Sequence, residues 1–280
     1  MSSKLIPEFK KSDDTIVLSV SKVKTFQTCK AKYRYCYIEK LPRKDWEFLT
    51  FGKFLHETLE NFYKEIINGS TILKNELMTN CFKAAYKNWK AKLKPEQVKE
   101  AKEILTQLLK KDEDITVLSV EKEFYIDIDS KILLNGYIDR IQLDPDGMLH
   151  VSDYKTTKNK KYLEKDHFQL LTYAFVMCLE DPTLEKVRTS YILLRHGFTS
   201  IVKEYSRAEI MKVENEFLEY AKQISDEKLY RPNPGFLCSY CDYYEGICPE
   251  GKKMESSEKY GVVGWSSENP ENTKFGKFKR

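Results

Sequence analysis

The sequence predicts an α/β protein in which helices flank one mixed β-sheet. Alternating apolar and polar residues mark extended segments between residues 115 and 205, and some of these are joined by tight turns. Segments before and after them repeat their apolar residues at helical spacing. The order of helices, three strands, a helix, further strands and a last helix implies a single sheet with helices packed on it.

Composition sets limits on the class of protein. The chain has 280 residues, of which 41% are hydrophobic and 32% charged, enough for one large domain or two small ones. It has no apolar run of about 18 residues, and its N-terminus has no apolar signal core, so we expect a cytoplasmic protein without a membrane partner. A net charge of +4 does not by itself indicate nucleic-acid binding, although a basic groove can be hidden in that average. Seven cysteines in such a chain favour packing or metal ligation over disulfides.

The N-terminal third is expected to be mostly helical. Residues 1–18 look like a polar arm, and Ser21 is a suitable N-cap for a first helix that continues to about residue 40. Three more helices, expected to form a side subdomain over about 47–112, cover 47–68, 75–93 and 96–111. The first of these three has an apolar face made of Phe51, Leu55, Leu59, Phe62 and Ile66.

The remaining elements follow from turn and cap signals. A strand is expected at 115–128, a helix at 161–179, and a strand pair at 187–197 and 199–205. Ser206 caps a long helix over 207–226. A single domain is expected over 19–250, followed by a flexible polar tail over 251–280.

Residues 131–157 form the most informative stretch. Two strands, from Ile132 to Leu143 and from Met148 to Thr157, flank the turn sequence Asp-Pro-Asp-Gly at 144–147. If Asp144 faces Gly147, then Asp139 lies across from Ser152. A one-residue bulge moves it opposite Asp153 instead.

This hairpin offers a candidate metal site. Facing positions have Cβ atoms roughly 4.5–5.5 Å apart, and Asp153 and Lys155 share a face of their strand. Two carboxylates beside a lysine suit Mg²⁺ or Mn²⁺, whereas scattered surface charge is the alternative. Glu121 and Glu123 on the preceding strand either point at the metal or form a solvated strand edge, and the solvated edge is the favoured interpretation.

Two helices carry further candidates. His56 lies beside the apolar stripe of its helix, where it is either a packing residue or a ligand for Mn²⁺. Gln169 and Tyr173 are four residues apart and share a helix face, from which they reach a phosphate or Lys155, or else form a polar helix edge.

The cysteine spacing is the sharpest signal. Cys238, Cys241 and Cys248 form a C-x2-C-x6-C pattern with Pro249 after the last. Such a triplet needs a fourth thiolate, for which Cys29 and Cys36 are candidates, and it suits Zn²⁺ or an iron–sulfur cluster. A metal there would fasten the C-terminal loop to the first helix like a clasp.

Taken together, these residues resemble a known family. The order S-x-S-x4-F-x2-C, G-x3-H, G-Y-x-D-R, D-x-K, Q-x3-Y and C-x2-C-x6-C is similar to the PD-(D/E)XK nuclease superfamily, RecB-type branch. The nearest resemblance is to the iron–sulfur exonucleases of the CRISPR adaptation and AddB kind, over about residues 19–250. It implies a restriction-endonuclease-like α/β fold.

The resemblance also implies residue roles. His56, Asp139 and Asp153 would hold the divalent metal with the backbone carbonyl of Tyr154, and Lys155 would orient the attacking water. Gln169 and Tyr173 would support Lys155 or the DNA backbone. The four ligands of a 4Fe–4S cluster, with Zn²⁺ as the alternative, would be Cys29, Cys238, Cys241 and Cys248. Two departures are Asp153, where many members carry Glu, and Lys30, where relatives often have Pro.

The expected function is metal-dependent DNA hydrolysis from free ends with a preference for single strands. Repair, recombination, CRISPR adaptation and phage DNA processing all fit, with proteins of those pathways as partners. The alternatives are a structure-specific endonuclease on the same fold and a non-catalytic nucleic-acid-binding module with a structural metal cluster. The residues expected to grip the substrate, with solvated helix faces as the alternative for most of them, are Lys30, Lys32, Arg34, Arg43, Lys44 and Lys53.

Overall fold

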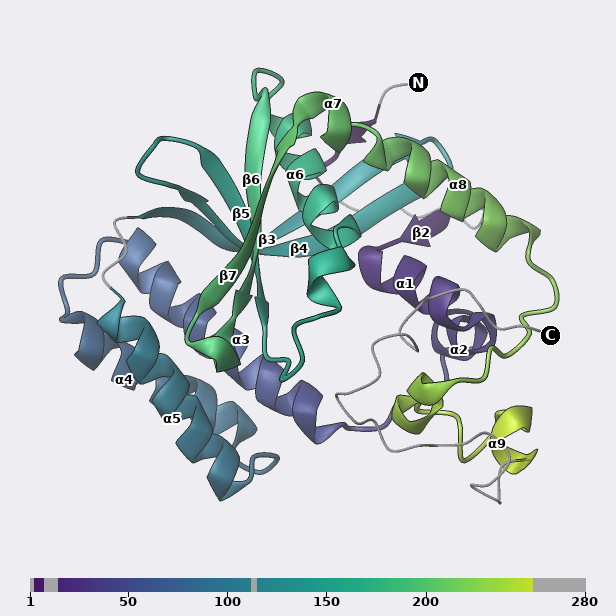
Figure 1. Cartoon of the computed structure of the whole chain (residues 1–280), viewed down its shortest axis with the longest axis horizontal. Coiled ribbons are helices and arrows are strands. Elements are labelled where there is room, and N and C mark those ends of the chain that lie inside the picture. Colours follow the sequence, from purple (N-terminus) through teal and green to yellow (C-terminus); the bar gives the residue numbers. More distant parts are fainter. Residues whose placement is uncertain (1–2, 8–14, 112–114, 254–280) are drawn as a thin grey trace. The chain divides into compact units, whose positions relative to one another are not determined.

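The computed structural model describes residues 3–7, 15–111 and 115–253 (Figure 1). The chain divides into two compact units. The sheet unit comprises Met1–Lys24 and Asp45–Glu227, and the cysteine unit comprises Thr25–Lys44 and Lys228–Arg280. The predicted domain boundaries stay predictions, and most of the expected tail, 254–280, lies outside the described residues.

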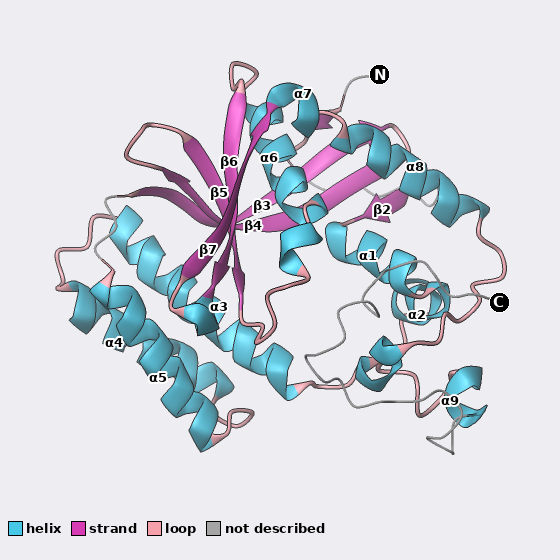
Figure 2. Cartoon of the chain, viewed as in Figure 1, coloured by secondary structure: helices cyan, strands magenta, loops and turns pink. Residues whose placement is uncertain are grey.

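The sheet unit is built on a mixed seven-stranded sheet in the order β1-β3-β4-β5-β6-β7, with β2 beside β4. The pairs β2/β4 and β5/β6 are parallel and the other pairs are antiparallel. A mixed sheet flanked by helices is therefore confirmed (Figure 2). The strands are β1 Lys4–Leu5, β2 Ile16–Leu18, β3 Thr116–Asp129, β4 Ile132–Leu143, β5 Leu149–Lys155, β6 Lys186–Leu193 and β7 Thr199–Ser206.

The expected polar arm needs correction, because residues 1–18 contribute β1 and β2 to this sheet. Both strands are short, and β1 is formed by only two residues. Their pairing partners, β3 and β4, lie more than a hundred residues away. Strands this short leave no alternation from which they could be predicted.

Helices cover the sheet in two groups, α3 to α5 on one side and α6 to α8 on the other (Figure 1). Four of the five apolar residues predicted on α3 are buried, and Ile66 is partly buried. They share a core with α4, α5 and the sheet residues Val120, Tyr154 and Ile192. The helices are α3 Glu47–Ile67, α4 Lys74–Trp89, α5 Pro95–Lys110, α6 Phe168–Glu180, α7 Arg207–Ile210 and α8 Val213–Asp226. Within the described residues, none has the length and apolar character needed to cross a membrane.

The hairpin turn settles the register of β4 and β5. Gly147 has φ +78°, its N–H donates to the Asp144 carbonyl at 2.8 Å, and the Asp144 N–H donates to the Met148 carbonyl at 3.1 Å. This is a three-residue loop closed by a left-handed glycine, the arrangement that produces a bulge. Arg140 therefore pairs with Ser152, as the bulged alternative predicted.

The first helix differs from the prediction at both ends. Helix α1, Val20–Thr28, is capped by Ser19, whose hydroxyl accepts from Lys22 N–H at 3.3 Å, so Ser21 is not the N-cap. The helix stops at Thr28 because Cys29 is extended, with φ −160° and ψ 114°. A short helix, α2 Lys30–Tyr33, and a π-helical turn, Arg34–Ile38, follow.

Two later helices are shorter than expected. A 3-10 turn, Leu163–Lys165, precedes α6, which begins at Phe168 rather than near residue 161. Ser206 is the predicted cap and accepts from the Glu209 N–H, but the helix that follows is interrupted between α7 and α8.

Candidate metal centre and catalytic cluster

A close approach between α3 and the end of β5 positions His56. Gly52 lies one helical turn before His56, and a Cβ at Gly52 would be 3.3 Å from Thr156 Oγ1. Glycine at this position therefore lets the helix pack directly against the end of the strand. The guanidinium of Arg195 holds the same segment by donating to the Thr156 carbonyl at 2.7 Å.

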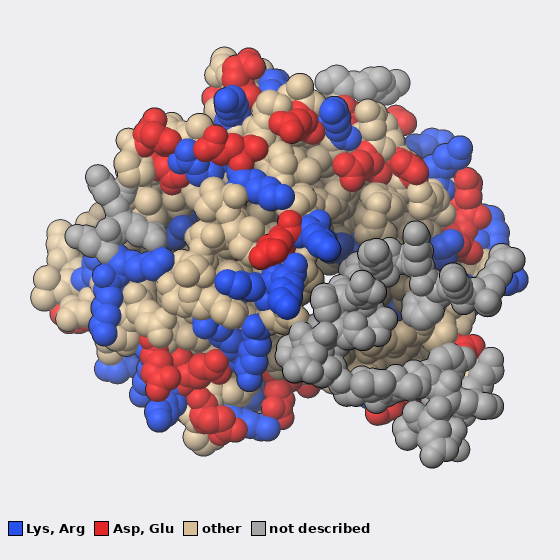
Figure 3. Space-filling view, in the orientation of Figure 1, with Lys and Arg blue, Asp and Glu red and all other residues tan. Residues whose placement is uncertain are grey.

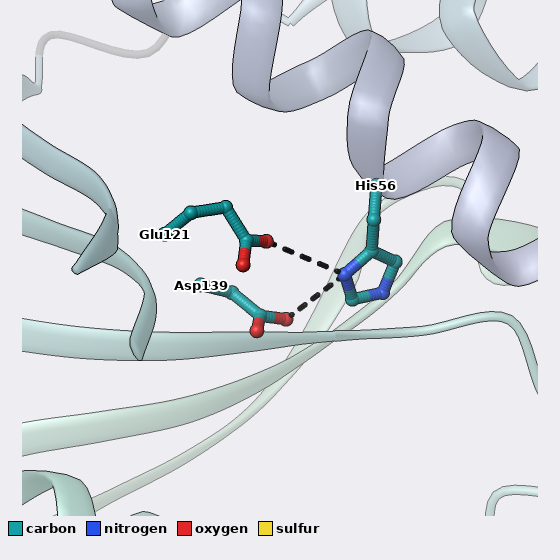
Figure 4. Close-up of side chains that lie close together, drawn as sticks. All are labelled: His56, Glu121 and Asp139. Atoms are coloured by element: carbon teal, nitrogen blue, oxygen red, sulfur yellow. Dashed lines mark ion pairs between the residues drawn. The ribbon is translucent and has the colours of Figure 1, made fainter. Parts of the chain in front are cut away.

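Three ligand-type side chains converge in front of His56 (Figure 4). His56 Nδ1 lies 3.4 Å from Asp139 Oδ2 and 3.8 Å from Glu121 Oε1. One donor atom from each of the three residues lies within 4.8 Å of the others. The other ring nitrogen, Nε2, is 3.1 Å from the Tyr154 carbonyl oxygen, so its N–H donates there and Nδ1 faces the two carboxylates.

The buried carboxylates and the imidazole of this group shift one another's pKa values. Burial raises the pKa of Asp139, and the charges of Asp153 and Glu121 raise it further. His56 lowers it, and the net pKa is about 7. Burial lowers the pKa of His56, but Asp139, Glu121 and Asp153 outweigh it and raise that pKa to about 9. Asp139 Oδ2 also accepts from the Tyr154 N–H at 2.8 Å, which fixes its direction. A positive charge between these oxygens, carried by a proton or a metal ion, is therefore strongly favoured.

Glu121 faces the metal-ligand group, which was the less favoured of the two interpretations drawn from the sequence. Its neighbours pair as Val120 with Arg140 and Lys122 with Ile138, which puts Glu121 across from Asp139. Its backbone has φ +45°, the left-handed region that non-glycine residues rarely adopt, and its carboxylate faces His56. Counting the register across from Asp139 could have found this residue.

Glu123 matches the solvated edge expected from the sequence. It is exposed and accepts from the hydroxyl groups of Tyr137 and Tyr125. The bond from Tyr137, and after it the bond from Tyr125, lowers the pKa of the Glu123 carboxyl. Glu123 therefore takes no part in the group around His56.

A second cluster surrounds Asp153 and Lys155. Lys155 Nζ lies 2.5 Å from Asp153 Oδ2 and donates to Gln169 Oε1 at 3.1 Å. The Gln169 amide donates to Asp153 Oδ1 at 2.6 Å and to the Tyr173 hydroxyl at 2.9 Å, and that hydroxyl donates to Asp153 Oδ1 at 3.3 Å. Gln169 thus contacts Lys155 as expected, whereas Tyr173 contacts Asp153 and Gln169.

The charge state of Lys155 follows from this contact. Burial lowers the pKa of its ammonium, but Asp153 raises it more, so the net pKa is above the ordinary value. Asp153 Oδ2 is buried, and its close contact is with the Lys155 ammonium at 2.5 Å. Asp153 is not one of the three residues whose donor atoms meet, although its charge acts on both His56 and Asp139.

The cysteine unit brings its N-terminal and C-terminal segments together. Cys29 Sγ accepts from the N–H groups of Lys32 and Asn233, each at 3.5 Å, and Cys238 Sγ accepts from Gly235 N–H at 3.4 Å. Burial raises the pKa of the Cys238 thiol, and the nearby Cys29 and Cys248 raise it further.

The same effect links Cys29 to a second cysteine of the triplet. Burial raises the pKa of the Cys241 thiol, and Cys29 and Cys238 add to it. Cys36 is buried and hydrogen-bonds the side chain of Tyr243. All of these cysteines are free thiols. Cys29 thus acts on two members of the C-terminal triplet, and Cys36 belongs to an apolar cluster against which Cys29 and Cys241 pack.

The family follows from comparison with known proteins. Residues 17–249 match the family model of the PD-(D/E)XK nuclease superfamily. The chain belongs to this superfamily. The resemblance drawn from the motifs is thus confirmed.

The curated relatives of this PD-(D/E)XK protein are much longer than the chain itself. An ATP-dependent helicase/deoxyribonuclease subunit from Streptococcus agalactiae serotype Ia is 29% identical over 177 residues, which is 58% of this chain and 16% of that protein. The subunit of the same name from Streptococcus pyogenes serotype M6 is 42% identical over 53 residues, 19% of this chain and 5% of that protein. A crystal structure from Eubacterium rectale has a TM-score of 0.46 and 12% identity, covering 80% of this chain and 86% of that one. The chain thus spans a small part of the curated relatives.

Proposed function

We propose that the chain is a metal-dependent DNA exonuclease that hydrolyses phosphodiester bonds from free ends and prefers single strands. One observation carries the proposal. His56, Asp139 and Glu121 direct three donor atoms at one point, next to the buried ion pair of Lys155 with Asp153. Phosphodiester hydrolysis needs both a cation for the phosphate oxygens and a fixed positive donor near the attacking water.

The donor set fits a divalent cation. With Nε2–H donated to the Tyr154 carbonyl, the lone pair of neutral His56 Nδ1 points at two carboxylates, which is repulsive unless a proton or a metal ion lies between them. Neighbouring ligands of Mg²⁺, each about 2.1 Å from the ion, lie about 3 Å apart, close to the 3.4 Å and 3.8 Å found. Asp153 Oδ2, which contacts the Lys155 ammonium at 2.5 Å, offers one more oxygen.

Four side chains would hold the ion, namely His56, Asp139, Glu121 and Asp153, whereas the Tyr154 carbonyl, predicted as a ligand, lies against His56 Nε2 instead. When bound, Mg²⁺ or Mn²⁺ would supply charge for the phosphate oxygens and lower the pKa of water. Lys155 would hold its ammonium against the reacting phosphate, with Asp153 and Gln169 limiting its rotation. Tyr173 would act as a positioning residue through Asp153.

A 4Fe–4S cluster on Cys29, Cys238, Cys241 and Cys248 completes the proposal. Three backbone N–H groups already point at two of these sulfurs, as suits thiolates carrying negative charge.

The pathway is proposed from the relatives. Proteins named as helicase/deoxyribonuclease subunits support a role in DNA repair or recombination, with a helicase-type protein as partner. CRISPR adaptation and phage DNA processing are the other settings in which such a nuclease would act.

The test compares linear and circular single-stranded DNA, end-labelled where possible, with Mg²⁺ or Mn²⁺. We expect chelator-sensitive loss of linear strands, intact circles, and no cleavage by Lys155→Ala or Asp153→Ala. The exposed Lys222→Ala on α8 is the matched control and should cleave normally. Cleavage of circles would favour the endonuclease alternative, and full activity in both site variants would refute the proposed site.

A further inference from the structure

An open cleft adjoins the metal-ligand group in the sheet unit. Its volume is about 600 Å³, within the range of pockets that hold small ligands. His56 and Glu121 form part of its wall, so the cleft and the proposed metal site share residues. The remaining walls come from the first turns of α3, from Trp89 at the end of α4 and from Thr156 after β5.

Flat and apolar surfaces line this cleft. Phe48 and Leu49, at the start of α3, are 47% and 50% exposed although both are large and apolar. The Trp89 indole is held in place, because its Nε1–H donates to Glu57 Oε2 at 2.5 Å while Asn88 donates to the other oxygen of that carboxylate at 2.6 Å. A fixed indole and an exposed phenyl ring are surfaces on which a nucleobase stacks.

Charge determines which part of a nucleotide fits here. Glu57 and Glu60 line the cleft, and their negative charges repel phosphate. Both carboxylates already have partners, since Glu57 accepts from Trp89 and Asn88 and Glu60 is paired with Lys64 at 2.6 Å. An uncharged base is therefore accepted where a phosphate is not. Lys53, exposed in the same wall, is placed for a phosphate outside the cleft.

On the face drawn in Figure 3, Lys and Arg side chains are interspersed with Asp and Glu. The attraction of that face for phosphate is therefore divided by neighbouring acidic groups.

We infer that this cleft binds one unpaired nucleobase of the strand being cut, stacked on Phe48 and Trp89, beside the phosphate at the metal site. The inference rests on the proposed nuclease function and adds the reason for a single-strand preference. A base in the cleft cannot remain paired, so a duplex must open before its phosphate reaches His56, Asp139 and Glu121.

Binding of 2-aminopurine oligonucleotides tests this inference without cleavage. Single strands of twelve nucleotides, with the fluorescent base at each position in turn, are bound to the full chain carrying Lys155→Ala. We expect quenching at one position, absent in the matching blunt duplex. Phe48→Ala should abolish the quenching and weaken single-strand binding roughly tenfold, whereas Phe48→Tyr should retain both.

The matched control is Leu73→Ala, which removes an apolar side chain that is 72% exposed and lies outside the cleft. Quenching and affinity unchanged in Phe48→Ala, or reduced equally in Leu73→Ala, would overturn the inference. The binding assay needs no cleavage, so its failure is separate from failure of the nuclease proposal. If the wild-type protein cleaves DNA but quenches 2-aminopurine at no position, the stacking site is refuted and the nuclease proposal stands.

Discussion

Metal binding should depend steeply on pH, because protons and the cation compete for the same atoms. Without metal, the pKa of Asp139 is about 7 and that of His56 about 9. A cation held by both must displace the protons that they carry. Below pH 7 both groups are protonated, between 7 and 9 only His56 is, and above 9 neither is.

The magnitude follows from the number of protons displaced. Two displaced protons raise the apparent affinity for Mn²⁺ about 100-fold per pH unit below pH 7, and one displaced proton raises it about tenfold per unit from 7 towards 9. The measurement is Mn²⁺ titration by calorimetry between pH 6 and 8.5 in buffers of different ionisation enthalpy, which counts released protons directly. His56→Gln removes one competing proton and should flatten the upper part of the curve.

Stability of the metal-free protein provides a second measurement. Both folded-state pKa values lie above the ordinary ones, so the protonated forms favour folding. The His56 contribution is fully present below pH 6.5 and is lost as pH rises to about 9. The Asp139 contribution is lost earlier, between about pH 4 and 7. Thermal stabilisation by Mn²⁺ should therefore grow with pH, and a Mn²⁺ affinity independent of pH, with no proton release, would refute the reasoning.

Three other predictions concern separate parts of the chain. Lys155→Ala should reduce single-turnover cleavage by about 100-fold or more while Mn²⁺ affinity changes little, because the ammonium serves the transition state; equal losses in both would contradict this. Cys29→Ser should remove bound iron and its visible absorption, whereas Cys36→Ser should keep both, and the reverse result would exchange their roles. His150→Gln should cost about 1–3 kcal/mol in urea unfolding, because His150 is buried and bonds Asp144 at 3.0 Å and Ser190 at 2.8 Å; an unchanged midpoint would show that glutamine satisfies both partners.

The sequence was most informative where periodicity and turn chemistry act locally. The apolar stripe of α3, the bounds of β4 and the turn at Gly197 before β7 were all predictable, since each depends on neighbouring residues. Cys81 and Cys178 are buried, in line with the expectation that some of the seven cysteines serve packing. The sequence motifs also led to the correct superfamily.

Features that depend on distant contacts were not predictable. Nothing near Cys29 marks the extended residue that ends α1, because the segment contacting it, around Asn233, lies two hundred residues later. The left-handed backbone of Glu121 is equally hidden, since a glutamate has no local preference for it. Tertiary packing imposes both conformations, and both lie at proposed metal ligands.

The hairpin turn links local chemistry to the site. A two-residue turn would have paired Asp139 with Ser152, and a slip of one residue moves every side chain of a strand to the opposite face. The left-handed Gly147 adds the third loop residue and brings the face of Asp139 into line with that of Asp153. The other face of β5 then carries His150 and Ser152, which bond Ser190 on β6. One glycine in a turn thus decides which polar residues of β5 join the metal centre and which form the buried network inside the sheet.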